Sequence, residues 1–345
     1  MGYYRDDSDL VVLSPSLSVK TIINEVNQIG LHLGYEKFER ELSDASVQDD
    51  PAIDDVSGAT TVVGGGDKGF NQSRRELAVD FTRYNQNTTY SGNVFFGNEA
   101  DFESTALSLA ATRDFLNKNF SVTGAYQYLE DAISNPNSVD DATMEHKTTH
   151  ALTLAISQVL STRASLYVGV NASRNQGFLS KPSRKIKVEQ VFDTGSSTTI
   201  LDERHPDERL RYVGFAKAKY LFKNDTALDA NVSFYSDDWG VTAQTQELRI
   251  SRYLSKNVIG RLRLRRYHQS AADFYRASYD RVSEEMTADG RLRGFDYHMF
   301  GAKIHYYPRL FSDTKVLWSL SVDRYQETNS GVTAFIYQFS TRIPF

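Results

Sequence analysis

The chain has 345 residues, of which 40% are hydrophobic and 12% aromatic, and its mean hydropathy is −0.46. No stretch approaches the roughly 18–20 apolar residues that a membrane-spanning helix needs, which excludes a helical membrane protein. The net charge of −5 comes without a basic tract, so nucleic acid is not expected as a partner. The absence of cysteine excludes disulfides and thiolate metal sites.

Segments of about ten residues with period-two alternation run along the whole chain, and no helical period is sustained. In residues 226–235, for example, Leu228, Val232 and Phe234 alternate with polar side chains. We predict fifteen strands on this pattern. They cover residues 9–21, 26–39, 73–84, 89–97, 103–113, 119–130, 149–160, 164–174, 209–221, 226–237, 241–252, 257–268, 295–306, 313–326 and 332–343.

Short and long connections interleave between these strands. The long ones are residues 40–72, 131–148, 175–208 and 269–294. A soluble β-sandwich also alternates, but short turns on one side and variable loops on the other are typical of outer-membrane barrels. The 20 Tyr and 20 Phe supply interfacial girdles for such a barrel. The sequence therefore predicts an all-β fold, a transmembrane antiparallel β-barrel that forms one domain over residues 1–345, with the long loops extracellular.

Fifteen strands is an odd number, whereas single-chain bacterial barrels have even numbers. The strand at residues 9–21 runs in the same sense as the last strand, so an opposite strand is expected before it. We predict that Tyr3 and Tyr4 form the outer end of this first strand, whose start lies upstream. Met1 is not followed by a signal peptide, which agrees with that prediction. Sixteen strands are therefore expected, and fourteen is the alternative.

Apolar and aromatic side chains alternate through the last segment, which ends at Phe345. Phe335, Tyr337 and Phe339 share one face of it. This ending resembles the C-terminal signal that the barrel-assembly machinery of Gram-negative bacteria reads. The resemblance implies a multi-pass protein of the cell outer membrane, with that machinery and outer-membrane lipid as partners.

Basic residues gather on those faces of the later strands that lie opposite apolar neighbours, so we expect them to face the lumen. These residues, called the basic wall here, are Lys217, Lys219, Arg249, Arg261, Arg263, Arg265, Lys303 and Lys315. Only Asp229, Glu247 and Asp323 oppose them on the same faces. Rows of Arg and Lys set the selectivity of anion pores, so the wall predicts a path for anions.

A neutral interior is the alternative interpretation. Acids in predicted loops, namely Asp237, Asp238 and Asp273, would then pair with the arginines of the wall. Both interpretations remain open at the level of sequence.

Other chemistry leaves little trace. His146 and His150 are four residues apart, a spacing that suits a metal ion only on a helix, and they fall at a loop-to-strand boundary. Residues 64–69 are glycine-rich but lack the Lys-Ser/Thr end of a phosphate loop. No catalytic set can be assembled, so we predict neither an enzyme nor a cofactor nor a metal site. Acidic loop tips such as Asp49 and Asp50 suit Ca²⁺ or are simply solvated.

Basic loop residues are expected to meet the phosphates of lipopolysaccharide. They are Lys181, Arg184, Lys185 and Lys187.

Several stretches resemble an uncharacterised, porin-like family of Gram-negative outer-membrane β-barrels that is filed under a domain of unknown function. They are Val-Ser-Gly-Ala-Thr at 56–60, Asp-Glu-Arg-His-Pro-Asp-Glu-Arg at 202–209, Asp-Asp-Trp-Gly at 237–240 and Gln-Ser-Ala-Ala-Asp-Phe-Tyr at 269–275. Tyr-Tyr-Arg-Asp-Asp at 3–7 and Ser-Pro-Ser at 14–16 resemble its early strand pair. The resemblance covers nearly the whole chain and implies a barrel, but it brings no established substrate or catalytic residue.

Most of these stretches fall in predicted extracellular loops or at strand tips, and we expect their polar and aromatic residues to converge into one network. The residues are Arg204, His205, Asp237, Asp238, Trp239, Asp273 and Tyr275. Such a network would cap the mouth, fold a loop into the lumen or present a docking surface. The plainer interpretation is a set of bonds that orders the loops.

Two functions follow from the sequence. The first is a porin-like channel for small hydrophilic solutes with a mild preference for anions. The alternative is a non-conducting barrel that anchors or threads a surface or periplasmic protein partner, such as a lipoprotein or a redox protein of an electron conduit.

Overall fold

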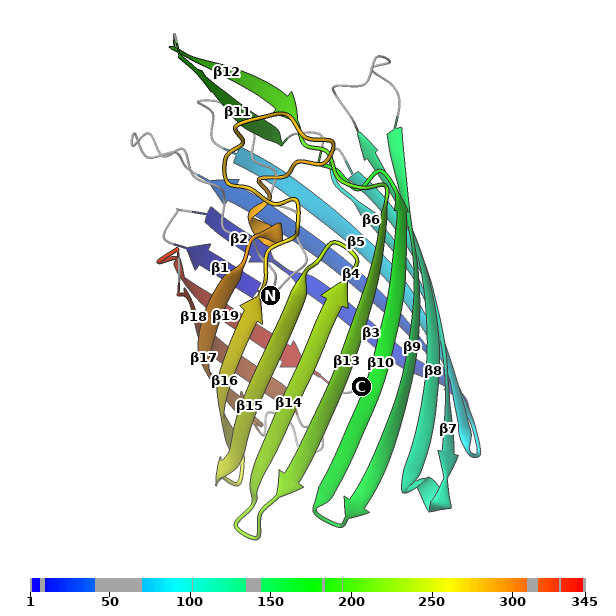
Figure 1. Ribbon diagram of the computed structural model, residues 1–345. Coiled ribbons are helices and arrows are strands. Elements are labelled where there is room, and N and C mark those ends of the chain that lie inside the picture. Colours follow the sequence, from blue (N-terminus) through cyan, green and yellow to red (C-terminus); the bar gives the residue numbers. More distant parts are fainter. Residues whose placement is uncertain are drawn as a thin grey trace.

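The computed structural model describes residues 2–6, 10–40, 70–100, 102–134, 144–181, 184–193, 195–308, 316–328 and 330–343. Most of them lie in antiparallel strands (Figure 1). The strands are β1 Gly2–Asp6, β2 Leu10–Ser14, β3 Ser16–Asn24, β4 Asn27–Arg40, β5 Phe70–Asn85, β6 Thr88–Asn98, β7 Phe102–Phe115, β8 Phe120–Ser134, β9 Met144–Ser161, β10 Ala164–Gly177, β11 Lys185–Phe192, β12 Gly195–Asp202, β13 Glu208–Leu221, β14 Thr226–Asp237, β15 Thr242–Ser255, β16 Val258–Gln269, β17 Phe295–Tyr306, β18 Leu317–Glu327 and β19 Thr333–Arg342. Two 3-10 helices, η1 Leu116–Lys118 and η2 Gly290–Leu292, complete the elements. No helix in these ranges is long and apolar enough to cross a membrane.

Each strand of the wall pairs with its neighbours along the chain, and β10 pairs with β13 across the β11–β12 hairpin. The main sheet has 17 strands when β2 and β3 are counted separately. Both pair with β4 and only Pro15, which has no N–H to donate, separates them, so they form one strand of the wall. The described wall therefore has the predicted sixteen strands, and the alternative of fourteen is wrong.

The seam between the first and last strands is joined by β1. This strand pairs with Ala334–Gln338 of β19 on one side and with β2 on the other. It covers only the end of the seam that carries the long loops. Nearer the short turns, β3 pairs with β4 and the end of β19 pairs with β18. β1 thus occupies the place that the sequence predicts for the outer end of a first strand.

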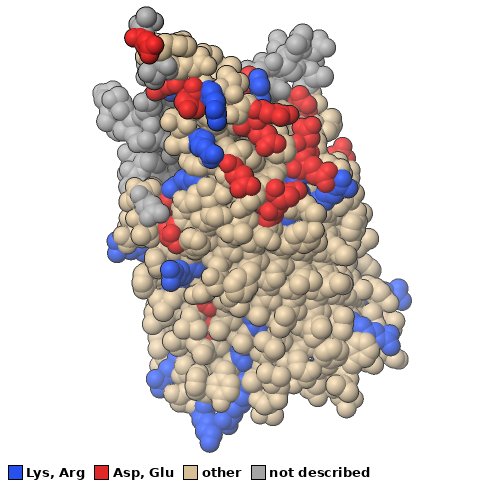
Figure 2. All heavy atoms as spheres, in the orientation of Figure 1, with Lys and Arg blue, Asp and Glu red and all other residues tan. Residues whose placement is uncertain are grey.

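Alternation along each strand separates an apolar outside from a polar inside. On β16, Leu262 and Leu264 are 63% and 47% exposed and point outward, whereas Arg261 and Arg263 face the interior and are partly buried. Opposite them on β17, Phe300 is 60% exposed on the outer face. The belt between the two ends is largely uncharged, and carboxylates gather at the long-loop end (Figure 2). This is the distribution that hydrocarbon outside and water inside require.

Connection lengths divide the two ends as predicted. Two-residue turns such as Gln86–Asn87 lie at one end, and Gln86 takes the positive φ of 38° that a tight hairpin demands. Aromatic pairs near these turns form part of a girdle, with ring centroids 4.8 Å apart for Tyr220 and Phe222 and 6.0 Å for Tyr306 and Trp318. We refer to the end with short turns as periplasmic and to the other as extracellular.

The prediction that residues 175–208 form a loop is wrong for the middle of this segment. Residues 175–208 contain the β11–β12 hairpin, which stands above the mouth (Figure 1). Ile186 and Val188 alternate there with Lys185 and Lys187, but the alternation is short and lies among polar residues, so the sequence did not predict strands.

The loop at 131–148 is shorter than predicted, because β8 runs to Ser134 and β9 begins at Met144. The interval 269–294 matches the connection between β16 and β17. Residues 41–69 lie outside the described part of the chain, as do Lys315 and Phe345.

Replacing Leu262 by Arg should destabilise the folded barrel by about 2 kcal/mol or more, because the charge would face hydrocarbon. The measurement is the free energy of unfolding in denaturant, made on protein folded into phospholipid vesicles. The matched control is Arg261→Lys on the inner face of the same strand, which should change this energy little. Equal losses in both variants would contradict the assignment of the two faces.

Candidate functional site: the basic wall and the extracellular cap

The basic wall lies on the inner faces of β13, β15, β16 and β17. Its seven described members alternate with outward apolar residues, and five of them, on β15–β17, form one cluster. Lys217 and Lys219 lie apart on β13, across β14 from that cluster. The eighth, Lys315, lies outside the described residues.

Two carboxylates sit among the cations of the cluster. Arg263 donates from Nε to Oε2 of Glu247 at 2.8 Å, and Arg249 forms an ion pair with the other oxygen of Glu247. Asp323 lies 3.5 Å from Nη1 of Arg263. The side chains of Glu247 and Asp323 are almost fully buried, so this part of the wall is a compensated ionic cluster.

The other members of the wall have weaker or no anionic partners. Lys219 lies 3.5 Å from Asp229 but its side chain is 74% exposed. Lys217 and Arg265 contact aromatic rings, with the guanidinium of Arg265 5.7 Å from the ring of Tyr297. Arg261 donates to the hydroxyl of Ser251 at 2.9 Å. In the described part of the chain, seven cations of the wall thus face the three carboxylates predicted from the sequence.

The loop acids that the sequence offered as partners of the basic wall contact other residues instead. Asp237 accepts from Nε of Arg209 at 2.8 Å, and the carboxylate of Asp238 accepts the backbone N–H of Leu210 at 3.0 Å. Asp273 packs against Gly240, where a Cβ would overlap its carboxylate and φ is +81°. These acids order the extracellular loops, and in the described structure the carboxylates that meet the wall come from the strands.

The extracellular loops form a folded cap, comprising residues 178–181, the β11–β12 hairpin with residues 203–207, and residues 270–294. One apolar cluster joins Ile186 and Val188 of the hairpin to Tyr279 and Met286 of the long loop. The backbones of Arg204 and Met286 also exchange two hydrogen bonds, of 3.0 and 2.9 Å. The hairpin and the long loop are therefore one packed unit.

The predicted network converges within this cap, around an aromatic centre. The rings of His205 and Trp239 lie 5.1 Å apart edge-on, and Phe274 lies 5.2 Å from Trp239. Arg209 stacks over the indole at 4.3 Å. The backbone N–H of Asp273 donates to Trp239 at 3.0 Å, and Tyr275 forms a backbone bridge with Thr287. Arg204 contributes its backbone, and its side chain is exposed.

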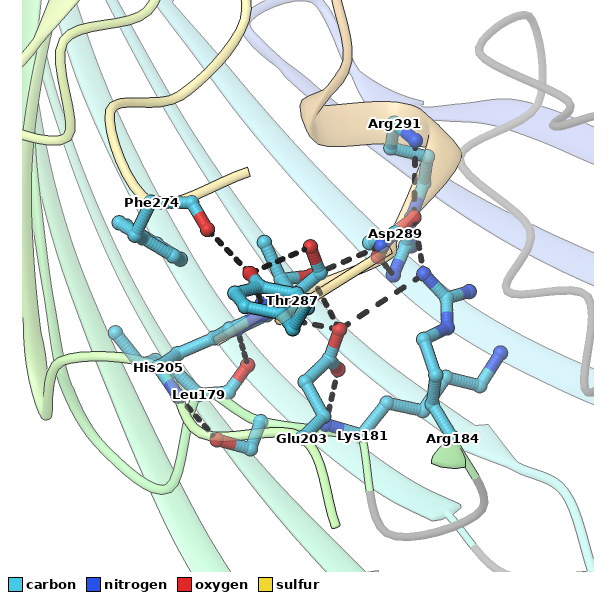
Figure 3. A network of polar contacts seen from close by, with 11 residues as sticks. Leu179, Lys181, Arg184, Glu203, His205, Phe274, Thr287, Asp289 and Arg291 are labelled. Carbon is cyan, nitrogen blue, oxygen red and sulfur yellow. Dashed lines mark hydrogen bonds and ion pairs between the residues drawn. The ribbon is translucent and has the colours of Figure 1, made fainter. Parts of the chain in front are cut away.

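Beside this centre lies a buried polar network that the sequence did not single out (Figure 3). Glu203, whose side chain has no exposed surface, accepts from the hydroxyl of Thr287 and from the backbone of Lys181. His205 places Nε2 3.2 Å from Glu203 and Nδ1 2.9 Å from the carbonyl of Leu179. Both ring nitrogens therefore lie beside oxygen atoms of the cap.

A second buried carboxylate, Asp289, continues the network. Arg184 lies 2.6 Å from it, and Arg291 donates to it from Nη2 at 2.7 Å. Burial alone would raise the pKa of Asp289, but the charges of Arg291 and Arg184 hold it well below its usual range. The pKa of Glu203 is also lowered, because its bonds with His205 and Thr287 and the charge of Arg184 outweigh burial.

This geometry corrects the expectation for two basic loop residues. Arg184 and Lys181 point into the cap and are mostly buried, so they do not face lipopolysaccharide. Lys187 is exposed, and Lys185 pairs with Asp202 at the surface. The signal that could have shown the buried pair was the acid-base order Asp-Glu-Arg-His at 202–205, in which every second residue turns inward. Among the described residues, no group of three His, Asp or Glu is placed to hold a metal ion.

The comparisons with known proteins agree with this architecture. The family model described as "Protein of unknown function (DUF3570)" matches residues 135–335, more than half of the chain. The chain belongs to this family. No curated protein matches it. The resemblance read from the short stretches at 202–209, 237–240 and 269–275 is thereby confirmed, since all three lie within the matched range.

Solved structures of similar fold include a bacterial polysaccharide outer membrane secretin, 7% identical, with a TM-score of 0.54 over 100% of this chain and 96% of that one. The siderophore receptor PirA from Pseudomonas aeruginosa is 8% identical, with a TM-score of 0.48 over 99% of this chain and 60% of the receptor. A ferric enterobactin receptor from the same organism is 10% identical, with a TM-score of 0.45 over 94% and 52%. The chain spans little more than half the length of these receptors. At 7% identity the likeness to the secretin shows a fold alone, that of an outer-membrane β-barrel.

Replacing Glu203 by Gln should open the cap of this DUF3570 protein. Breaking a buried ion pair from one side costs about 3–5 kcal/mol, so local opening should become at least about a hundredfold more frequent. Trypsin cleavage within residues 270–294 of the folded barrel measures this opening. Asp202→Asn, at the exposed neighbouring position, is the control, and equal cleavage of both variants would show that the buried network does not hold the cap.

The cap should become more stable as the pH rises from about 8 to 10. Burial, together with the charges of Arg291 and Arg184, lowers the pKa of Lys181 from 10.5 to about 8. Between these values the open cap binds more protons than the closed cap, so a higher pH favours closure. Hydrogen-exchange protection factors in residues 270–294 should rise by about tenfold or more over this range. Lys181→Met should remove the rise and Lys187→Met should leave it, and a rise retained in Lys181→Met would refute the assignment.

Proposed function

We propose that this barrel is a porin-like channel of the outer membrane for small hydrophilic solutes, with a preference for anions. The observation that supports the proposal is the excess of cations in the basic wall, whose seven described members face the three carboxylates of Asp229, Glu247 and Asp323. Fixed cations in a water-filled lumen raise the local concentration of anions and repel cations.

The rest of the inner face is polar and carries charges of both signs. Asn93 donates to Asp80 at 3.0 Å, Asn171 donates to Thr153 at 2.8 Å, and Lys147 pairs with Asp131 at 2.6 Å. These contacts satisfy the polar side chains; the Lys147–Asp131 pair is neutral, whereas Asp80 keeps its negative charge beside Asn93. The cluster of cations therefore lies on one side of the lumen, the side that carries the basic wall.

The alternative function is a non-conducting barrel that anchors or threads a surface or periplasmic partner. The observation that favours it is the cap, whose apolar clusters and buried ion pairs order the loops over the mouth. Conduction separates the two proposals, since a barrel sealed by this cap carries no current.

Other partners remain predictions. Of the four basic loop residues predicted to meet lipopolysaccharide phosphates, Lys187 and Lys185 are exposed, and Lys185 also pairs with Asp202. The role of Phe345 as an assembly signal for the barrel-assembly machinery stays a prediction. No enzymatic function, cofactor or nucleic acid enters the proposal, because the residues of the wall and the cap supply charge and packing.

The test of the channel is ohmic conductance in planar bilayers, with a reversal potential in a KCl gradient that indicates anion preference. In Lys217→Gln/Arg265→Gln, anion preference should fall about threefold for each charge removed, because a charge about 6 Å away in water contributes about 0.7 kcal/mol. Lys187→Gln, outside the lumen, is the control and should keep the original preference. A silent barrel would support the alternative, and cation preference would overturn the charge argument.

A further inference from the structure

Two pairs of like charges stand directly opposite each other on the inner face of the barrel. Arg249 of β15 faces Arg263 of β16, and Arg261 of β16 faces Lys303 of β17. Like charges in directly opposed positions of a sheet repel and destabilise it. Each pair therefore needs an anion nearby, and within the described ranges only the first pair forms ion pairs with carboxylates.

The first pair is compensated by its own strands. Glu247 bridges the two guanidinium groups, and Asp323 approaches Arg263 from β18. Gly301, which lies between Arg263 and Asp323 in the register, makes this approach possible, because a Cβ there would overlap the carboxylate of Asp323. The carboxylates of Glu247 and Asp323 thus both form ion pairs with Arg263.

The second pair has no carboxylate within ion-pair distance among the described residues. Its register forms a row across four strands, Ser251, Arg261, Lys303 and Ser321. Arg261 donates to Ser251, and the ammonium of Lys303 has no hydrogen bond or ion pair in the described structure. The surrounding ionisable groups are Arg249, Asp323 and His305. Asp323 also acts electrostatically on Lys303, but its ion pair is with Arg263.

The chemistry of this row is that of an anion site. The guanidinium and the ammonium are hydrogen-bond donors, and the two hydroxyls each have a partner: Ser251 accepts from Arg261, and Ser321 donates to Gln338 in a long bond of 3.4 Å that an anion would replace. Both serines are at least nine-tenths buried, at 9% and 5% exposure. Oxyanions bound by ionised donors form the short, strong bonds that would offset the repulsion of the two cations. Two fixed positive charges match a doubly charged tetrahedral anion better than a halide.

We infer that Arg261 and Lys303, flanked by Ser251 and Ser321, form a binding site for a tetrahedral oxyanion of the phosphate or sulfate class. The inference deepens the proposed function, since it names the solute class that the basic wall would take. The Arg249–Arg263 pair shows what the site lacks: there, the chain itself supplies the anion.

The test uses the full barrel in detergent and in planar bilayers. Equilibrium dialysis with labelled inorganic phosphate, with sulfate as competitor, measures binding without any need for conduction. Arg261→Gln and Lys303→Gln should each weaken binding by about tenfold or more, because a hydrogen bond to a charged group is lost. Ser321→Asp should abolish binding by placing a carboxylate beside Lys303, whereas Lys187→Gln, on the exposed β11–β12 hairpin outside the lumen, should change binding less than about twofold.

The bilayer measurements distinguish a failure of the phosphate site from a failure of the channel proposal. Phosphate should reduce the chloride current of the original barrel, and Ser321→Asp should keep the current but lose the block. A conducting barrel that binds neither phosphate nor sulfate overturns the site and leaves the channel standing. A silent barrel that binds phosphate through Arg261 and Lys303 overturns the channel and leaves the site standing. Binding that is unchanged in correctly folded Arg261→Gln and Lys303→Gln overturns the site outright.

Discussion

The pairing of backbone groups between neighbouring strands is the interaction on which the rest of this structure depends. In hydrocarbon an N–H or C=O without a partner costs several kcal/mol, so the wall is built of strands that satisfy each other. Pairing also sets the direction of every side chain, because successive residues of a strand point to opposite faces. Leu262 and Leu264 must then lie outside, and Arg261, Arg263 and Arg265 must lie inside. The charge of the lumen is a direct consequence of that alternation.

Register decides which of these inner charges meet. Glu247 falls opposite Arg265 but pairs diagonally with Arg263 and, along its own strand, with Arg249. Asp323 reaches across Gly301 to Arg263. One part of the wall is neutralised in this way, and the next row, with Arg261 and Lys303, is not. A shift of two residues in one strand would exchange these partners without changing the composition of the inner face. The local balance of charge is therefore a property of strand pairing rather than of residue counts.

The cap grows from the same strands that carry the basic wall. Asp237 ends β14 and anchors Arg209, and the long loop of the cap connects β16 to β17. Its buried carboxylates are compensated by Arg184 and Arg291 and contacted by His205, so the loops gain a fixed arrangement instead of a large apolar core. The loops of the cap and the residues of the basic wall therefore lie on the same strands, and the two candidate sites are covalently continuous through β16 and β17.

The sequence by itself determined the solvent of each face, the number of strands, the division of short turns and long loops, and the family. It also placed seven described cations of the wall on the inner side, because period-two alternation is local and needs no knowledge of neighbours. Only the tertiary structure decided which cations are neutralised and where Arg184 and Lys181 point. It alone showed that residues 185–202 form a hairpin that packs on residues 270–294. Those features join residues far apart in the chain, such as Glu203 to Thr287, and no local pattern records the contact that creates them.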